Sequence, residues 1–189
     1  MKRTFSLVEL MVVLVIIVVI AGLLMAGISG ARRKAMVTST KSQISLIELA
    51  LSNYNTNYPY QVPFKQQCRP ASDNDFAMVP SGVTVANNPT GGNAPPLISE
   101  LWVALDGNNA IYNPRQIQFA VPDAVALDPW ENEFRVAFDA TADDLVHTDF
   151  VFGGGPVNAS WAIWSPGPDK VDNATDGHEA NADNINSWD

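Results

Sequence analysis

The sequence predicts an α+β protein in which one long N-terminal helix packs on a small antiparallel sheet. Two observations support this fold class. A helical pattern runs from about Phe5 to Asn57, far longer than the average helix of about 11–12 residues. Short alternating segments typical of antiparallel strands follow, mainly after Pro129. A length of 189 residues suits one domain with an anchor and hardly suffices for two separate cores.

The first half of the helical pattern is apolar enough to lie in a membrane. Leu10 to Ile28 is an unbroken run of 19 apolar or glycine residues, about 28 Å long as a helix and close to the hydrocarbon thickness of a bilayer. Lys and Arg flank it on both sides, so the charge balance does not set its orientation. A secretory signal peptide cut near "AGISGA" is an alternative, although its apolar region is ordinarily only about 7–15 residues long. A plain membrane anchor leaves Glu9 unexplained, because carboxylates in a membrane are costly and usually paired.

The second half of the predicted helix, residues 31–58, is amphipathic. No proline interrupts it, and Pro59 ends the pattern. An amphipathic helix of any small α+β domain would have the same pattern. One apolar stripe recurs every three or four residues and would face a partner layer: Ile44, Ile47, Leu51, Tyr54 and Tyr58.

The residues after the helix predict a loop first and strands later. Gln61 to Pro96 is rich in Pro, Asn, Gly and Ser, which predicts a long surface loop. "PLISELWVALDG" indicates a short helix ended by Gly107. "DFVFGG" and "WAIWS" indicate short strands. "ENEFRVAFD" indicates a half-buried strand with one apolar face, made by Phe134, Val136 and Phe138.

Charge and cysteine content restrict the classes of function. The chain beyond Lys34 contains 19 of the 20 acidic residues and six of the 11 basic residues, which gives it a net charge of −13 with histidine neutral. An acidic region repels phosphate backbones, so we expect no nucleic acid partner. The single cysteine, Cys68, cannot form an intrachain disulfide, so packing or a bound ion must hold the fold.

The stretch "MKRTFSLVELMVVLVIIVVIAGLL" resembles the signal and first helix of type IV pilins and type II secretion pseudopilins. The resemblance implies that a prepilin peptidase cuts between Thr4 and Phe5 and that the new terminus is N-methylated, although the family ordinarily has glycine in place of Thr4. Glu9 is then the fifth mature residue, as in the family. The implied organisation is a leader at 1–4, a transmembrane and filament-core helix half at 5–30, an amphipathic half at 31–58 and a globular domain at 59–189.

"LDPWENEF" resembles the turn before a strand in the major pseudopilin. Asp128, Pro129 and Trp130 match, whereas Glu131 and Glu133 replace a glycine and a proline. We expect a structural role: Pro129 fixes a turn, Trp130 supplies buried area and Asp128 caps backbone groups. An active-site role for Asp128 is the alternative.

The segment "SPGPDKVDNATDGHEANADNINSWD" is acidic, and it has too few apolar side chains to fold by burial alone. Two interpretations stay open: a disordered acidic tail, or a loop organised by a hard cation. Calcium is the natural candidate because it takes about 6–8 oxygen ligands in flexible geometry. A partial match to the calcium loop of helix–loop–helix proteins is weak, because acidic loops rich in Asn and Gly produce it by chance.

The same segment resembles the C-terminus of the major pseudopilin, which has a Ser-x-Gly-x-Asp turn, an acidic stretch and a tryptophan close to the end. In this chain the turn ends at Asp169, and Asp183 lies in the matching second aspartate region. The resemblance implies a structural calcium ion with these two residues as its main ligands. Asp172 and Asp176 are additional candidates.

The resemblance covers about Phe5 to Pro59 and Leu127 to Asp189. It implies the type IV pilin fold and a structural, non-enzymatic subunit of a type II secretion pseudopilus. The implied location is the bacterial inner membrane, crossed once, with the C-terminal domain in the periplasm. The implied partners are further copies in a helical filament, minor pseudopilins, the prepilin peptidase, membrane lipid, and the platform protein with its assembly ATPase.

Two other classes of function stay open. One is a surface type IV pilin or minor pilin used for adhesion, motility or DNA uptake, although the cysteine pair that closes the terminal loop of common adhesive pilins is missing. The other is a membrane-anchored periplasmic enzyme or binding protein. That class requires a catalytic cluster, and the sequence pattern contains none.

Overall fold

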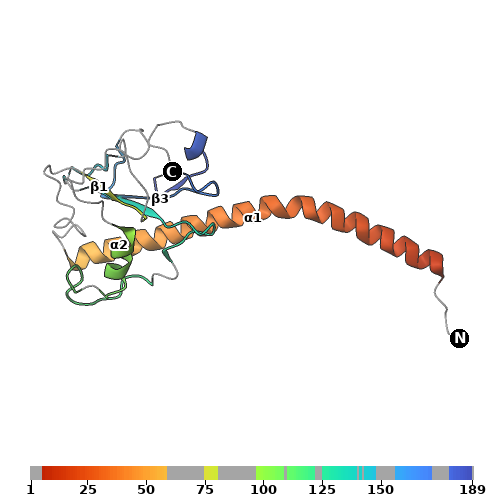
Figure 1. Cartoon of the computed structure of the whole chain (residues 1–189), viewed down its shortest axis with the longest axis horizontal. Helices are drawn as coiled ribbons and strands as arrows, with labels where there is room; N and C mark the ends of the chain where they lie inside the picture. Colours follow the sequence, from red (N-terminus) through yellow and green to blue (C-terminus); the bar gives the residue numbers. More distant parts are fainter. Residues whose placement is uncertain are drawn as a thin grey trace. The chain divides into compact units, whose positions relative to one another are not determined.

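The computed structural model describes residues 6–58, 75–80, 97–108, 110–121, 125–139, 141, 143–147, 156–171 and 179–188, without the side chains of 23–27 and 180. The chain divides into two compact units, Met1–Thr38 and Ser39–Asp189. Helix α1 begins in the first unit and ends in the second (Figure 1).

Helix α1 spans Leu7–Asn57, so the predicted long helix is confirmed. It ends two residues before Pro59, because a residue that precedes proline is disfavoured in the helical conformation. Among the residues that the structure describes, no helix is both long enough and apolar enough to cross a membrane.

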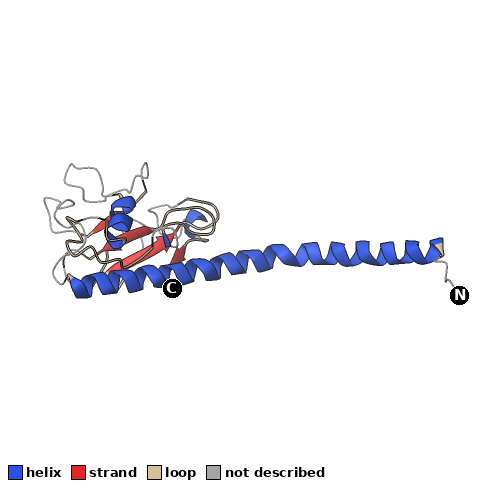
Figure 2. Cartoon of the chain, turned by 90° about the horizontal axis from the view of Figure 1, so that it is seen from below, coloured by secondary structure: helices blue, strands red, loops and turns tan. Residues whose placement is uncertain are grey.

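The second unit contains an antiparallel sheet, which confirms the α+β class. Within the described part of the chain it has four strands in the order β1-β2-β3-β4, namely β1 (Phe76–Met78), β2 (Arg135–Phe138), β3 (Trp161–Ser165) and β4 (Ile185–Asn186). In the register, Val136 of β2 lies opposite Met78 of β1 and Ile163 of β3. Figures 1 and 2 both show the strands alongside the part of α1 that belongs to this unit.

Two predictions for this unit are corrected. Strand β1 lies inside the segment Gln61–Pro96, which was expected to be a loop. The prediction missed the strand because its short sequence, "FAM", is flanked by residues of loop composition. Strand β2 was expected to be half-buried, yet all its residues are buried. Its second face packs in a hydrophobic cluster that includes Ala77, Ala137 and Ala162. The expected strand "DFVFGG" lies outside the described residues.

The predicted short helix is confirmed as α2 (Ile98–Leu105). Gly107 follows it with a φ of 86°, a left-handed conformation that favours glycine. A Cβ at this position would approach the backbone of Gln116 to 3.0 Å, so the chain also needs glycine here for close packing.

The apolar stripe of α1 is buried in the second unit, as predicted. Tyr54 and Tyr58 pack their rings 4.9 Å apart, and both contact the ring of Phe119. The Tyr58 hydroxyl donates to Oδ1 of buried Asn113 at 2.6 Å. Every member of the stripe is at most 7% exposed: Ile44, Ile47, Leu51, Tyr54 and Tyr58.

Candidate functional site

The predicted processing site, Thr4 and Phe5, lies outside the described residues. The structure begins to describe the chain at Ser6, immediately before α1. Oε2 of Glu9 accepts a hydrogen bond of 2.9 Å from the backbone N–H of Ser6. The Ser6 hydroxyl in turn accepts a 3.4 Å hydrogen bond from the backbone N–H of Val8.

These contacts form a helix cap that our sequence analysis missed. Ser6 occupies the N-cap position and Glu9 the third helical position, where the carboxylate reaches back to the N-cap N–H. A serine followed three residues later by glutamate, before an apolar run, was the available signal. Glu9 therefore has a local partner within its own chain.

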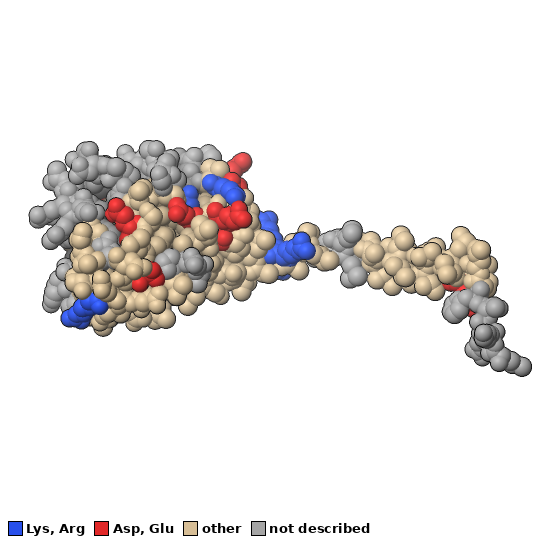
Figure 3. All heavy atoms as spheres, turned by 60° about the horizontal axis from the view of Figure 1, so that its bottom comes forward, with Lys and Arg blue, Asp and Glu red and all other residues tan. Residues whose placement is uncertain are grey.

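The first turns of α1 expose apolar side chains on every face. The large apolar side chains described between Leu7 and Ile20 are 51–77% exposed. Figure 3 shows this part of α1 as an uncharged surface, apart from the acid at its start. A helix that is apolar all round requires a cover of lipid or of other helices.

A three-residue hairpin loop precedes β2 at the predicted turn. The backbone N–H of Asp128 donates to the carbonyl of Asn132 at 2.9 Å, and residues 127 and 133 form an antiparallel bridge. The loop residues Pro129, Trp130 and Glu131 lie between the two. Oδ1 of Asp128 accepts hydrogen bonds from the backbone N–H groups of Trp130 and Asn132, at 2.9 and 2.8 Å.

Glu131 ends this loop in a left-handed conformation, with a φ of 66°. Hairpin loops of three residues ordinarily place glycine there, because a side chain disfavours a positive φ. Glu131 is exposed, and it keeps this geometry at a conformational cost.

Asp128 also contacts the turn that follows β3. Its Oδ2 accepts hydrogen bonds from the Ser165 hydroxyl at 2.5 Å and from Nδ2 of Asn132 at 2.8 Å. The same Nδ2 donates to the carbonyl of Gly167 at 2.8 Å, and the Ser165 hydroxyl accepts from the Gly167 N–H at 3.1 Å. Asp128, Asn132 and Ser165 are all buried. The predicted turn is thereby joined to the segment that carries Asp169.

Asp169 and Asp183, the two main predicted calcium ligands, lie next to each other. The backbone N–H of Asp169 donates to Oδ2 of Asp183 at 3.3 Å. Oδ1 of Asp169 accepts a hydrogen bond from the N–H of Val171 at 2.8 Å. Asp172 and Asp176, the additional candidates, lie outside the described residues.

The end of the acidic segment packs on the sheet. Strand β4 pairs with β3, and the ring of Trp188 meets that of Trp164 at a centroid distance of 6.4 Å. Ser187 is bound twice to Ile163: its N–H donates to the Ile163 carbonyl at 2.9 Å, and its hydroxyl accepts from the Ile163 N–H at 3.1 Å. A wholly disordered tail is therefore the wrong interpretation for residues 179–188.

The donor set near Asp169 suits a hard cation. The neighbouring side chains of Asp169 and Asp183 offer carboxylate oxygens, which calcium prefers over nitrogen or sulphur. Among the described residues, no group of three His, Cys, Asp or Glu side chains is arranged to hold a metal ion. A complete site therefore requires further oxygens beside the two adjacent aspartates.

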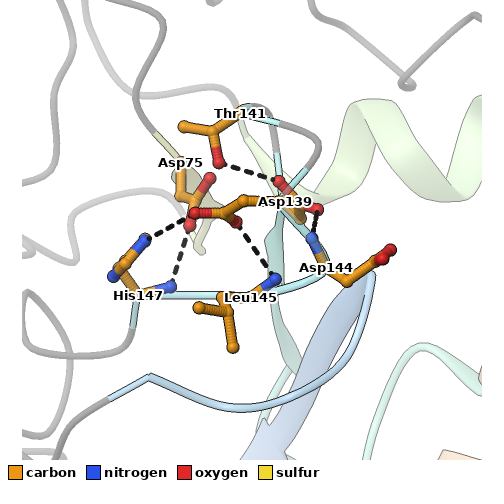
Figure 4. A network of polar contacts seen from close by, with 7 residues as sticks. Asp75, Asp139, Thr141, Asp144, Leu145 and His147 are labelled. Atoms are coloured by element: carbon orange, nitrogen blue, oxygen red, sulfur yellow. Dashed lines mark hydrogen bonds and ion pairs between the residues drawn. The ribbon is translucent and has the colours of Figure 1, made fainter.

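A second set of aspartates, which our sequence analysis also missed, organises the loop after β2 (Figure 4). Asp75 is buried, and its Oδ2 accepts the backbone N–H of His147 at 2.8 Å. Asp139 accepts the Thr141 hydroxyl at 3.1 Å and the N–H of Asp144 at 3.0 Å. The sequence feature that could have predicted this loop was a run of Asp and Thr directly after a strand, because these side chains often accept hydrogen bonds from nearby backbone groups.

The same loop holds an exposed contact between Asp143 and His147. Oδ2 of Asp143 lies 3.4 Å from Nε2 of His147. The nearby Thr141 hydroxyl is the main cause that lowers the pKa of Asp143, and the N–H of Leu145 contributes as well. These contacts fix the loop backbone, and both side chains of the pair are exposed.

Comparison of the chain with models of protein families, with curated proteins and with solved structures gave no match.

Proposed function

We propose that this chain is a structural subunit of a type II secretion pseudopilus. The supporting observation is the exposed apolar first half of α1, which follows a capped start at Ser6 and Glu9. A soluble monomer rarely exposes so large an apolar surface. Lipid would cover this helix in the waiting subunit, and the helices of other copies would cover it in a filament.

In this proposal the waiting subunit crosses the bacterial inner membrane once, with its acidic domain in the periplasm. The uninterrupted apolar run from Leu10 to Ile28 supports this location. The basic residues Arg32, Arg33 and Lys34 follow the run and would lie among the lipid head groups. The chain acts by assembly and catalyses no reaction.

A prepilin peptidase would remove residues 1–4 and leave a methylated amine on Phe5. That amine would lie about one helical turn from Glu9. An unpaired carboxylate is strongly penalised at low dielectric, so Glu9 of one subunit would pair with the Phe5 amine of its neighbour. This pairing would set the axial register of the helical filament.

A calcium ion would stabilise the C-terminal part of the domain. Asp169 and Asp183 would supply carboxylate oxygens, and nearby backbone carbonyls would add further ligands. The ion supplies positive charge, which offsets the repulsion between the two carboxylates. The adjacency of these residues in the fold supports this part of the proposal.

The filament would grow from copies of this chain together with minor pseudopilins, on an inner-membrane platform protein driven by an assembly ATPase. Because the domain is strongly acidic, nucleic acid is not among the proposed partners.

Mass spectrometry of the protein purified from membranes that contain a prepilin peptidase tests the proposal. We expect a chain that begins at Phe5 and carries one methyl group, and an uncut chain in cells without the peptidase. An intact Met1 in the presence of the peptidase, or a cut near Ala31, would rule out the pseudopilin assignment. Filaments on the cell surface instead of in the periplasm would favour a type IV pilin.

A further inference from the structure

We infer that Asp128 is a positioning residue for the proposed calcium loop. Its buried carboxylate holds the turn at Gly167 in the shape that brings Asp169 next to Asp183, and so sets the affinity for calcium. The inference rests on the calcium site of the proposed function. It assigns Asp128 no contact with the ion.

Asp128 fixes both peptide groups of Gly167 through two intermediates. Ser165 connects the carboxylate to the Gly167 N–H, with hydrogen bonds of 2.5 and 3.1 Å. Asn132 connects it to the Gly167 carbonyl, with two hydrogen bonds of 2.8 Å. Because Asp128, Asn132 and Ser165 are buried, water does not readily replace these contacts.

Gly167 is the point where this network touches the proposed ligands. Its φ of 71° is left-handed. A Cβ on Gly167 would collide with the backbone carbonyl oxygen of Asp183, so the two backbones lie in close contact. Asp169 follows two residues later and donates its N–H to the Asp183 carboxylate. A displaced Gly167 would therefore move Asp169 relative to Asp183.

Asp128→Asn should release this turn with little change in side-chain volume. Oδ1 of the new amide still accepts from the N–H groups of Trp130 and Asn132. Its NH₂ group, however, would face the Ser165 hydroxyl and the Asn132 amide, which both donate at present. The turn would then open for part of the time, and the apparent affinity for calcium would equal the intrinsic affinity multiplied by the fraction of chains that remain closed.

Asp139→Asn is the matched control. Asp139 follows β2 at its other end, and its carboxylate also accepts one hydroxyl and one backbone N–H, from Thr141 and Asp144. Titration of calcium into the full chain in detergent, followed by calorimetry, measures the affinity. We expect a loss of about tenfold or more for Asp128→Asn and a change within about twofold for Asp139→Asn.

Hydrogen exchange separates positioning from a general structural role. In EDTA, the amides of Gly167, Asp169 and Lys170 should exchange faster in Asp128→Asn than in the wild type. Saturating calcium should restore their protection, because the ion binds only the closed turn. If exchange is faster in both conditions and throughout β2 and β3, the role is merely structural and the inference fails.

Ser165→Ala is the second variant, in case Asp128→Asn does not fold. It removes the hydroxyl that joins Asp128 to the Gly167 N–H, and we expect the same loss of affinity. Wild-type affinity in this variant, or in folded Asp128→Asn, would overturn the inference and leave calcium binding intact. If the wild type binds no calcium, the calcium proposal fails, and exchange at Gly167 in EDTA alone decides whether Asp128 holds the turn.

Discussion

The hydroxyl of Tyr54 donates a 2.5 Å hydrogen bond to the backbone carbonyl of Tyr112, 58 residues further along the chain. Tyr54 is 1% exposed on α1, and Tyr112 belongs to the turn region after α2. Burial raises the pKa of Tyr54 to about 12, with a further contribution from the neighbouring Tyr58 and Tyr112. The contact ties the end of the long helix to the segment between α2 and β2.

Tyr54→Phe should lower the free energy of unfolding by about 1–2 kcal/mol, because it leaves the Tyr112 carbonyl without this donor. Urea unfolding of the full chain in detergent measures the change. Ser45→Ala is the control, since its exposed hydroxyl donates to the carbonyl of Lys41 within the same helix. Equal effects in the two variants would contradict the prediction.

Glu131→Gly should stabilise the protein by about 0.5–1 kcal/mol. The left-handed conformation costs a residue with a side chain about 1–2 kcal/mol, and glycine removes this cost. The extra freedom of glycine in the unfolded chain destabilises the variant by about 0.5–1 kcal/mol, which leaves the smaller net gain. Thermal unfolding detects the gain. Glu133→Gly, at a neighbouring position without a positive φ, should lower the melting temperature. A loss of stability in Glu131→Gly would show that its side chain has a role other than occupying the turn.

Glu48→Gln should raise the melting temperature at neutral pH. Burial raises the pKa of Glu48, so the folded state favours the protonated form. Protonated Glu48 contributes its full stabilisation at pH values below the pKa that it has in the unfolded chain. This stabilisation is lost as the pH rises through the higher pKa that it has in the folded protein. The gain should stay below about 1 kcal/mol, because the side chain is partly solvated. Melting curves at pH 7 and at acid pH test the sign. The melting temperatures of Glu48→Gln and the wild type should differ at pH 7 and become equal at acid pH.

Glu9→Gln separates the two roles of Glu9. The amide oxygen still accepts the N–H of Ser6, so the helix cap stays, whereas the charge is lost. We expect normal processing of the leader and strongly reduced filament yield. Glu9→Ala removes the cap as well. Mass spectrometry verifies processing, and sedimentation with electron microscopy measures filaments. Wild-type filament yield with Glu9→Gln would show that capping, and not charge, is what assembly requires.

Removal of calcium should lower the melting temperature and expose the segment between Asp169 and Asp183 to protease. At a free calcium concentration about 100 times the dissociation constant, the ion adds about 2.7 kcal/mol to the stability of the folded state. Asp183→Asn should lose most of this calcium-dependent gain, while Glu179→Gln, an exposed neighbour in the short helix Glu179–Asn181, should keep it. A melt that EDTA leaves unchanged would favour an acidic segment without calcium.

The regular elements with a strong local pattern were predictable. The apolar stripe that ends at Tyr58 predicted the buried face of α1, and the residues "WAIWS" predicted β3, because helices and strands place side chains at fixed periods. Strand β1 was missed because its three residues, Phe76–Met78, are too few to establish a period within a segment of loop composition.

Contacts between distant residues were not predictable. Asp128 was expected to cap its own turn, but nothing local to it indicated the hydroxyl of Ser165, 37 residues away. The adjacency of Asp169 and Asp183 followed only from a family resemblance, because 14 residues separate them and spacing alone does not specify how the chain returns. The cap of Glu9 on Ser6 was local and was readable from the sequence.

Strand β4 also has a consequence for solubility. It pairs with Trp164 and Ser165 of β3 and so covers part of the outer hydrogen-bonding side of that strand, which would otherwise present unpaired N–H and carbonyl groups to other chains. The edge that β4 itself presents is only Ile185–Asn186, and very short edge strands are a common defence against aggregation. A chain truncated after Asp183 would offer β3 as an open template for pairing with another copy.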